Sequence, residues 1–145
     1  MDPALKDAIV FHDNLNPAIW GDENMLPEVH ADLMRIMDDF KEFLNVDDLD
    51  IVDITVSGSN AAYTYTPHSD IDLHLVVNVP PNQDKIFTEL FDAKKALYNL
   101  TRNIKVRGFD VELYVQDAKN PVESMGIYSV PVSYTHLTLP TICSV

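Results

Sequence analysis

Two segments of this 145-residue chain place acidic side chains at alternate positions, and this alternation constrains the fold more than any other feature. In residues 70–75 (DIDLHL), acidic or imidazole side chains alternate with aliphatic ones. Residues 109–115 (FDVELYV) follow the same two-residue period. Successive side chains of a β-strand point to opposite faces of its sheet. Both segments are therefore predicted to be strands with one apolar face and one polar, largely acidic face.

The acidic face of the first segment is a candidate metal site. Asp70 and Asp72 lie two residues apart, so their Cα atoms should be about 6–7 Å apart. Two carboxylates this close repel, and each raises the pKa of the other unless a cation or strong donors lie between them. Mg²⁺ prefers oxygen ligands and binds through one or two carboxylates, water and phosphate oxygens. An isolated Asp-x-Asp pair also occurs on sheets that carry acids only for solubility, and this alternative stays open.

A Gly-Ser turn precedes this acidic strand. Residues 51–57 (IVDITVS) are rich in β-branched side chains and are predicted to form a strand that ends at Gly58 and Ser59. Glycine lets the backbone approach a phosphate closely, and backbone N–H groups and the serine hydroxyl can donate to phosphate oxygens. Most such turns have no further role. Next to an Asp-x-Asp strand, however, the turn indicates a phosphate cradle beside a metal site.

Helical periodicity fills the intervals between the strands. Residues 27–44 and 83–100 carry apolar side chains at steps of three and four, which predicts two amphipathic helices. Residues 104–106 and 109–115 indicate a strand or hairpin around Gly108, and residues 60–65 a short helix. The apolar stripe expected to bury the second long helix consists of Ile86, Phe87, Leu90, Phe91, Ala93, Leu97 and Leu100. The predicted fold is α+β: a mixed sheet of three to five strands with both long helices packed on one face and the acids on or near the other.

Composition narrows the classes of function. The formal net charge is −13, from 10 Lys and Arg against 23 Asp and Glu. Passive nucleic-acid binding is not expected, because it depends on Lys and Arg contacts to phosphates. One cysteine excludes a disulfide framework and zinc sites built on several thiolates. The sequence contains no apolar run long enough to span a membrane and no basic leader, so we expect a cytoplasmic protein without membrane contact.

The turn and the two acidic strands together resemble a known signature. Gly58 and Ser59, a ten-residue spacer and then residues 70–73 (DIDL) are similar to the motif of the DNA polymerase β-like nucleotidyltransferase superfamily. Glu112 matches the third carboxylate of that family best, with Asp110 as the reserve choice. The longer frame, over about residues 14–130, resembles phage-type and other uncharacterised nucleotidyltransferases. It does so through Asn16, Pro17 and Trp20, residues 27–29 (PEV) and residues 111–116 (VELYVQ).

The resemblance implies an enzyme that moves a nucleoside monophosphate from a nucleoside triphosphate to a hydroxyl or phosphate acceptor. It implies two Mg²⁺ ions, one held by Asp70 and Asp72 and a second held by these two with Glu112. Gly58 and Ser59 would seat the terminal phosphates. The three carboxylates are accordingly expected to converge on one point. The alternative is a nucleotide-binding or regulatory protein of the same fold without turnover. The nucleotide and the acceptor are not specified.

Several further residues are candidates for supporting roles. The basic ones, which could contact a polyphosphate or the acceptor or simply be solvated, are Lys94, Lys95, Arg102, Lys105 and Arg107. His74 shares the acidic face and is expected either to support the site residues or to be exposed. Tyr63, Tyr65 and His68 lie between the two motifs and could stack on a base or pack on the sheet. Ser57 departs from the family pattern, which usually has an apolar residue before the glycine.

The last fifteen residues differ from the rest of the chain. They read PVSYTHLTLPTICSV, and no Asp, Glu, Lys or Arg occurs after Glu123. This string resembles translated sequencing-adapter sequence found at the ends of metagenomic reading frames. We therefore predict a nucleotidyltransferase-like domain over residues 1–130, truncated at its C-terminus, and a non-native tail over residues 131–145. A natural tail is the alternative.

Overall fold

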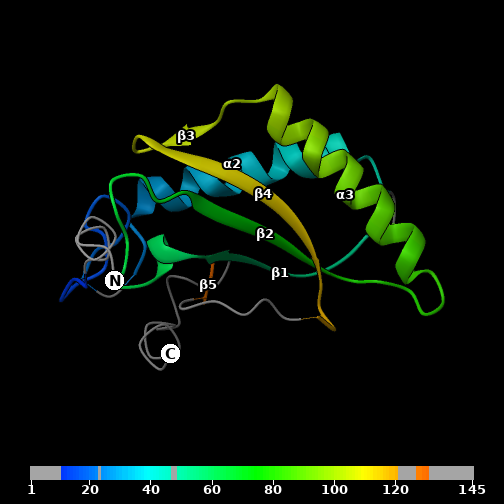
Figure 1. The fold of residues 1–145 in the computed structure, drawn as a ribbon, viewed down its shortest axis with the longest axis horizontal. Coiled ribbons are helices and arrows are strands. Elements are labelled where there is room, and N and C mark those ends of the chain that lie inside the picture. Colours follow the sequence, from blue (N-terminus) through cyan, green and yellow to red (C-terminus); the bar gives the residue numbers. More distant parts are fainter. Residues whose placement is uncertain (1–10, 23, 47–48, 121–126, 131–145) are drawn as a thin grey trace, which may run out of the picture.

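A computed structural model describes residues 11–22, 24–46, 49–120 and 127–130 of the chain. Within these residues two long helices accompany a five-stranded mixed sheet, which confirms the α+β prediction (Figure 1). The predicted tail lies outside the described residues. In chain order the elements are α2 (Pro27–Leu44), β1 (Asp50–Ser57), the 3₁₀ turn η1 (Ser59–Ala61), β2 (Ile71–Asn78), α3 (Asp84–Thr101), β3 (Lys105–Val106), β4 (Phe109–Asp117) and β5 (Ile127–Ser129).

The strand order places the two acidic strands side by side. The order is β3-β4-β2-β1-β5, with β2 and β4 parallel and the other neighbours antiparallel. Helix α3 makes the crossover that a parallel β2–β4 pair requires. In register, Asp72 of β2 lies opposite Glu112 of β4 on one side and Ser57 of β1 on the other. The sheet therefore aligns the end of β1 with both acidic strands.

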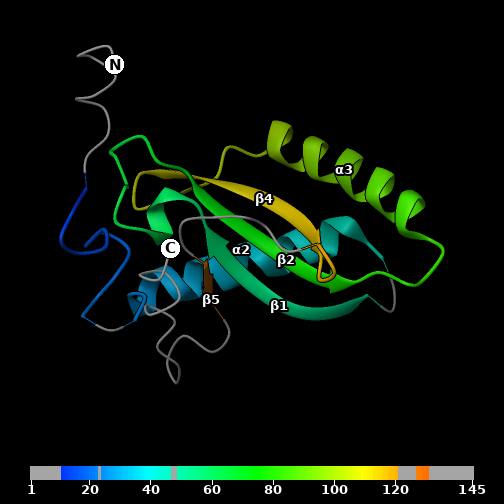
Figure 2. The same ribbon diagram turned by 60° about the horizontal axis from the view of Figure 1, so that its bottom comes forward.

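The alternation predicted from the sequence divides the sheet into a core face and a polar face. On β2, Ile71, Leu73 and Leu75 are fully buried, and Leu113 of β4 joins them in the core. Helix α2 covers this face (Figures 1 and 2). Its first turn contains a proline, where the missing N–H costs no hydrogen bond. The side chains that α2 buries are Val29, Leu33, Met37, Phe40 and Leu44.

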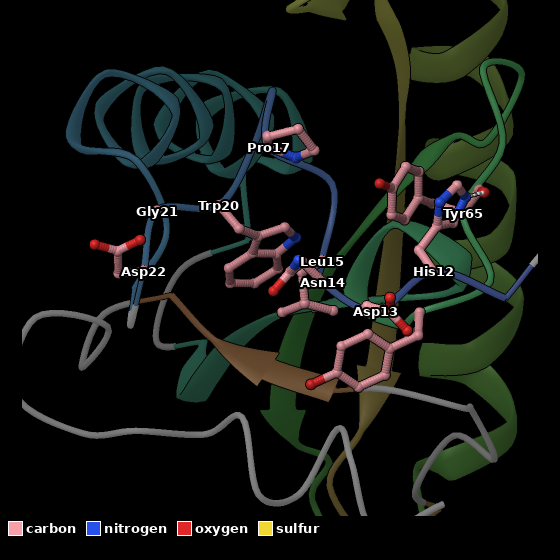
Figure 3. A pocket seen from close by; sticks show the side chains of 10 residues that line it. His12, Asp13, Asn14, Leu15, Pro17, Trp20, Gly21, Asp22 and Tyr65 are labelled. Atoms are coloured by element: carbon pink, nitrogen blue, oxygen red, sulfur yellow. Dashed lines mark hydrogen bonds between the residues drawn. The ribbon is translucent and has the colours of Figure 1, made fainter.

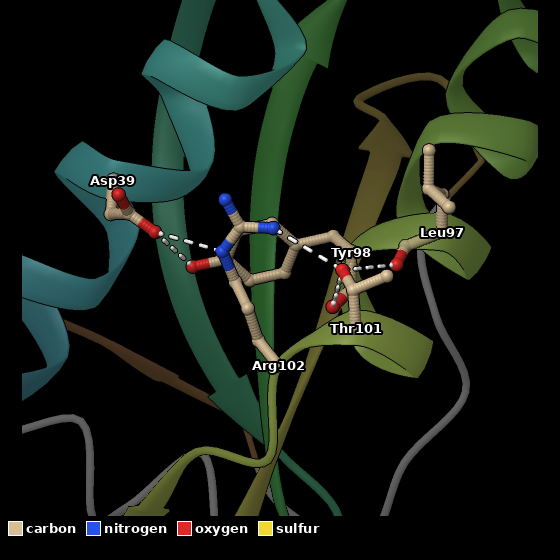
Figure 4. Close-up of polar contacts among 5 residues, drawn as sticks. All are labelled: Asp39, Leu97, Tyr98, Thr101 and Arg102. Carbon is tan, nitrogen blue, oxygen red and sulfur yellow. Dashed lines mark hydrogen bonds and ion pairs between the residues drawn. The ribbon is translucent and has the colours of Figure 1, made fainter.

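Helix α3 is held against α2 by Tyr98. Its buried ring meets Phe40 edge-on with 4.9 Å between centroids, and its hydroxyl donates to Asp39 Oδ2 at 2.7 Å (Figure 4). The Arg102 guanidinium lies 4.4 Å from the centre of the Tyr98 ring and 3.4 Å from Asp39 Oδ2. Burial, followed by the hydrogen bond to Asp39, raises the pKa of Tyr98. Tyr98 thus joins the two helices through one aromatic contact and one polar contact.

The predicted burial of the α3 stripe is wrong for most of its residues. Phe91 and Tyr98 are the buried side chains of α3, and they lie seven residues apart on one face. Because α3 packs beside β4 rather than across the sheet, only a narrow strip of the helix reaches the core. The large aliphatic side chains left exposed are Ile86 (68%), Leu90 (41%), Leu97 (53%) and Leu100 (85%).

Asn99 of α3 protects the open edge of β4. Strand β3 pairs only with the first two residues of β4, so the rest of that edge lacks a partner strand among the described residues. Asn99 Nδ2 donates to the Leu113 carbonyl at 3.0 Å, and Asn99 Oδ1 accepts from the Leu113 N–H at 3.0 Å. One side chain thus satisfies both backbone groups of an edge residue, as a neighbouring strand would.

The remaining differences from the sequence-based expectations are local. The hairpin around Gly108 is confirmed, whereas the helix expected over residues 60–65 is only the short η1 turn. The sequence does not indicate β5, which pairs with β1 through three residues. In the described parts of the chain, no helix is long and apolar enough to cross a membrane.

Replacing Asn99 tests the edge arrangement. Asn99→Ala should lower the free energy of unfolding by about 2 kcal/mol, because two partly buried backbone groups lose their partners. Urea denaturation measures this loss. Thr88→Ala, on the exposed part of the same helix, is the control and should change stability by less than about 0.5 kcal/mol. Equal effects of the two substitutions would contradict this role for Asn99.

Candidate active site

The polar face of the sheet carries a row of three side chains across three strands. Ser57 of β1, Asp72 of β2 and Glu112 of β4 are register partners and so project from the same face. Asp70 lies just before β2 begins. Thr55, His74 and Tyr114 form the next row. The parallel pairing of β2 and β4 therefore brings together acids that are forty residues apart in sequence.

The three predicted acids interact electrostatically. Asp72 is half-buried, and its pKa is raised to about 6 by burial and by the negative charges of Glu112 and Asp70. At neutral pH, ionisation of Asp72 therefore lowers the free energy of unfolding. A cation bound nearby would remove that cost, because an opposite charge favours the ionised form.

Gly58 brings the turn into direct contact with Asp72. Its backbone has φ 84° and ψ −170°, a region that is essentially restricted to glycine. A Cβ atom at this position would lie 2.6 Å from Asp72 Oδ2, closer than van der Waals contact allows. The absence of a side chain thus lets the turn lie against the acidic strand. The predicted neighbourhood of Gly58 and Asp72 is present in the fold.

Hydrogen bonds tie the turn to the start of β2. Ser59 Oγ donates to Ser69 Oγ at 2.6 Å, and Ser69 Oγ also accepts from the Thr66 N–H at 2.8 Å. Asn60 Nδ2 donates to the carbonyls of Ser69 and Asp70, at 2.9 and 3.2 Å. These hydrogen bonds therefore join the two ends of the loop between the motifs. Neither Asn60 nor Ser69 stands out in the sequence as a site residue, although both directly adjoin motif residues.

His74 is buried rather than exposed, and it explains the unusual Ser57. The imidazole Nε2 lies 2.8 Å from Ser57 Oγ, and the ring stacks on Tyr114 with 4.8 Å between centroids. Burial lowers the pKa of His74 to about 4, and the Lys95 ammonium adds to the effect. His74 is therefore neutral at pH 7. An apolar residue in place of Ser57 would leave this buried nitrogen without its partner.

Tyr114 connects these rows to Lys95 of α3. Burial, followed by the hydrogen bond that the Tyr114 hydroxyl donates to Glu112, raises the pKa of Tyr114. Lys95 Nζ lies 4.3 Å from the centre of the Tyr114 ring. A positive charge thus stands on the α3 side of the acidic row, separated from it by one aromatic ring.

The other predicted basic candidates are engaged elsewhere. Lys94 donates to the Leu44 carbonyl at the end of α2, and Arg102 contacts Asp39 between the helices. Lys95 is the candidate that contacts Tyr114 and so lies beside the row of His74 and Tyr114. The remaining two form the ion pairs Lys105–Asp110 at 2.8 Å and Arg107–Glu28 at 2.7 Å. Because Asp110 is already paired with Lys105, Glu112 is favoured over Asp110 as the third acid.

Two of the aromatic residues between the motifs line a cavity of about 610 Å³ beside residues 11–22, here called the N-terminal arm (Figure 3). Tyr63 and Tyr65 contribute to its wall together with Trp20. The Tyr65 ring stacks on His12 with 3.8 Å between centroids, so one of its faces is already covered. His68 is exposed, and its N–H is bonded to Thr66 Oγ1. Tyr63 and Tyr65 thus lie at a cavity, and His68 is not among its lining residues.

The expected convergence of the three carboxylates on one point stays a prediction, although the charges of Glu112 and Asp70 both act on Asp72. Among the residues that the structure describes, no group of three His, Cys, Asp or Glu side chains is arranged to hold a metal ion. Mutual repulsion opposes such a gathering of carboxylates. The residues nevertheless fit Mg²⁺, which needs only one or two carboxylates when water and phosphate oxygens supply the remaining ligands. The raised pKa of Asp72 and the close contact between its carboxylate and Gly58, where a Cβ atom would not fit, are the observations that support this fit.

Comparison with protein families adds independent support. A model of the nucleotidyltransferase domain matches residues 33–125. The chain belongs to this family. The match runs from α2 through β4 and includes the turn, Asp70, Asp72 and Glu112. Searches of the curated proteins and of the solved structures find no match. The nucleotidyltransferase domain thus carries the whole polar row, whereas the N-terminal arm lies before the matched segment.

The contact between the turn and Asp72 can be tested with two glycines. Gly58→Ala should destabilise the fold by about 3 kcal/mol, because the methyl group meets both a forbidden backbone region and the Asp72 carboxylate. Gly108 also has a positive φ, of 81°, but a methyl group there would meet nothing within 4 Å. Gly108→Ala should therefore cost only about 1 kcal/mol in chemical denaturation. A smaller loss for Gly58→Ala than for Gly108→Ala would contradict the close approach.

The raised pKa of Asp72 predicts a pH-dependent stability. The folded state favours protonated Asp72, so ionisation destabilises the fold above about pH 6, and this cost disappears as the pH falls toward 3.8. In chelator, Asp72→Asn should melt at a higher temperature than the unsubstituted chain at pH 8, and the two should converge near pH 4. Asp110→Asn removes an exposed, paired acid and is the control. A difference for Asp72→Asn that is independent of pH would disprove the shift.

Proposed function

We propose that this chain is a metal-dependent nucleotidyltransferase that moves a nucleoside monophosphate from a nucleoside triphosphate to a hydroxyl or phosphate acceptor, releasing pyrophosphate. The proposal rests on one observation above all. The row of Ser57, Asp72 and Glu112 lies against a glycine turn within a nucleotidyltransferase domain. The polymerase β-like superfamily and the phage-type frame, inferred from sequence, belong to the same proposal.

In this proposal the acids bind the metal and the turn binds the phosphates. Asp70 and Asp72 hold Mg²⁺ on the triphosphate, and Glu112 helps them to hold a second ion near the acceptor. When bound, magnesium neutralises phosphate charge and lowers the pKa of the acceptor hydroxyl. Backbone N–H groups next to Gly58 and the Ser59 hydroxyl orient the terminal phosphates, for which Ser59 would exchange its bond to Ser69.

Electrostatics support a nucleotide that arrives with its metal. At a net charge of −13, the chain repels a bare polyphosphate, and the acidic row adds to that repulsion. Lys95 provides a positive charge on the same face, next to Tyr114 and hence near Glu112. We assign to it a role in attracting the phosphates or a charged acceptor. Neutral His74 contributes packing behind the row rather than charge.

A nucleotide-binding protein without turnover is the second candidate. It is favoured by the observation that no three-ligand metal group forms among the described side chains. In that case Asp72 and the turn would hold a magnesium–nucleotide complex, while Glu112 would stay bonded to Tyr114. The two candidates share binding and differ in pyrophosphate release.

Incubation with each labelled nucleoside triphosphate and a mixture of acceptors tests the proposal. We expect Mg²⁺-dependent pyrophosphate release. Asp70→Asn, Asp72→Asn and Glu112→Gln should each reduce it at least about a hundredfold, the scale for removing one group that stabilises transition-state charge. Each variant should retain the far-UV circular dichroism of the unsubstituted chain.

Asp110→Asn is the matched control, because it removes an acid from the same strand that is paired with Lys105. It should retain most of the activity. Undiminished activity in Asp72→Asn would rule out the proposed mechanism. Magnesium–nucleotide binding without pyrophosphate release, for any acceptor, would instead support the second candidate.

A further inference from the structure

The N-terminal arm reaches the candidate site through one buried side chain, Asn60. Asn60 has no exposed surface and lies directly after Gly58 and Ser59. On the arm side, Trp20 Nε1 donates to the Asn60 carbonyl at 2.7 Å, and Asn16 Nδ2 donates to Asn60 Oδ1 at 3.0 Å. Two residues that precede the family match thus contact the residue that follows the motif turn.

The other end of the Asn60 side chain holds the backbone that leads into β2. Its amide nitrogen donates to the carbonyls of Ser69 and Asp70. An asparagine amide has one oxygen acceptor and two N–H donors, and here the oxygen and the nitrogen are both engaged. Because the oxygen faces the arm and the nitrogen faces Asp70, only a side chain with this polarity satisfies both sides.

The arm presents its two donors from a defined structure. The Asn16 carbonyl accepts from the N–H groups of Ile19 and Trp20, and Asn16 Oδ1 accepts from the Ala18 N–H at 3.0 Å. Trp20 is 4% exposed and meets Tyr128 edge-on with 4.5 Å between ring centroids. Contacts other than those to Asn60 therefore hold both donor side chains in place.

We propose that Asn60 is a positioning residue, oriented by Asn16 and Trp20, that fixes the Asp70 backbone beside the Gly58–Ser59 turn. The N-terminal arm is then a structural part of the metal–phosphate site. This inference rests on the proposed function, because it assigns Asp70 to that site. Contacts behind a metal ligand typically change metal affinity by about 10–100-fold when they are lost.

Asn16→Asp tests the polarity of this connection at constant volume. The aspartate still accepts from the Ala18 N–H, but it presents an oxygen where Asn60 Oδ1 needs a donor. Calorimetric titration with magnesium pyrophosphate, the leaving group for any nucleotide, should show about tenfold weaker binding than for the unsubstituted chain. Asn14→Asp adds the same charge to an exposed position of the arm and should bind as the unsubstituted chain does.

Trp20 supplies a second readout, because it is the single tryptophan of the chain. Magnesium pyrophosphate should change its fluorescence in the unsubstituted chain and in Asn14→Asp, and the change should be lost in Asn16→Asp. A residue that only stabilises the fold would lower the melting temperature without altering affinity or this signal. If Asn16→Asp does not fold, Trp20→Phe removes the donor to Asn60 while keeping a ring against Tyr128, and calorimetry gives the same comparison.

The outcomes separate this inference from the function on which it rests. Binding to the unsubstituted chain with unchanged affinity in the folded variants would overturn the inference and leave the proposed function standing. An equal loss in Asn14→Asp would also overturn it, because charge alone would then explain the effect. Failure of the unsubstituted chain to bind magnesium pyrophosphate would overturn both.

Discussion

The close approach of Gly58 to Asp72 is the contact on which the rest of the site depends. A Cβ atom at position 58 would clash with the Asp72 carboxylate. Because glycine has no Cβ atom, the turn after β1 can lie against β2, and Ser59 and Asn60 come within hydrogen-bonding distance of the residues that precede β2. At the same point, burial and the negative charges of Glu112 and Asp70 raise the pKa of Asp72. The glycine turn and the negative charge of the carboxylates thus lie at one place, where a metal–phosphate complex would neutralise that charge.

Sheet topology supplies the second requirement, which is an acid from a distant part of the chain. A hairpin would place sequence neighbours side by side, whereas the β2–α3–β4 crossover makes the two acidic strands parallel. The crossover helix also contributes Lys95 to the polar face and Asn99 to the edge of β4. Helix α3 therefore serves the site and the sheet edge, and only two of its side chains are buried in the core.

Much of this arrangement follows from periodicity in the sequence, and some of it does not. Helix α2 begins and ends at the predicted residues, and both acidic strands have the predicted faces, because burial on one side imposes a clear pattern. The outward stripe of α3 is not predictable in this way, because its exposed Ile and Leu residues have the same helical spacing that marks the buried side of α2. The roles of Asn60 and Asn99 depend on partners far away in the sequence, as does the three-residue β5. The composition of a segment cannot reveal such partners.

The parallel register of β2 and β4 couples the packing of the core to the position of Glu112. If β4 slipped by one residue, Glu112 would turn toward the apolar interior and Leu113 would take its place on the polar face. Such a slip would also break the bonds of Asn99 to Leu113. A register error in β4 would therefore disrupt the core at the same time as it displaces Glu112. The burial that stabilises this sheet thus also protects the position of its acids.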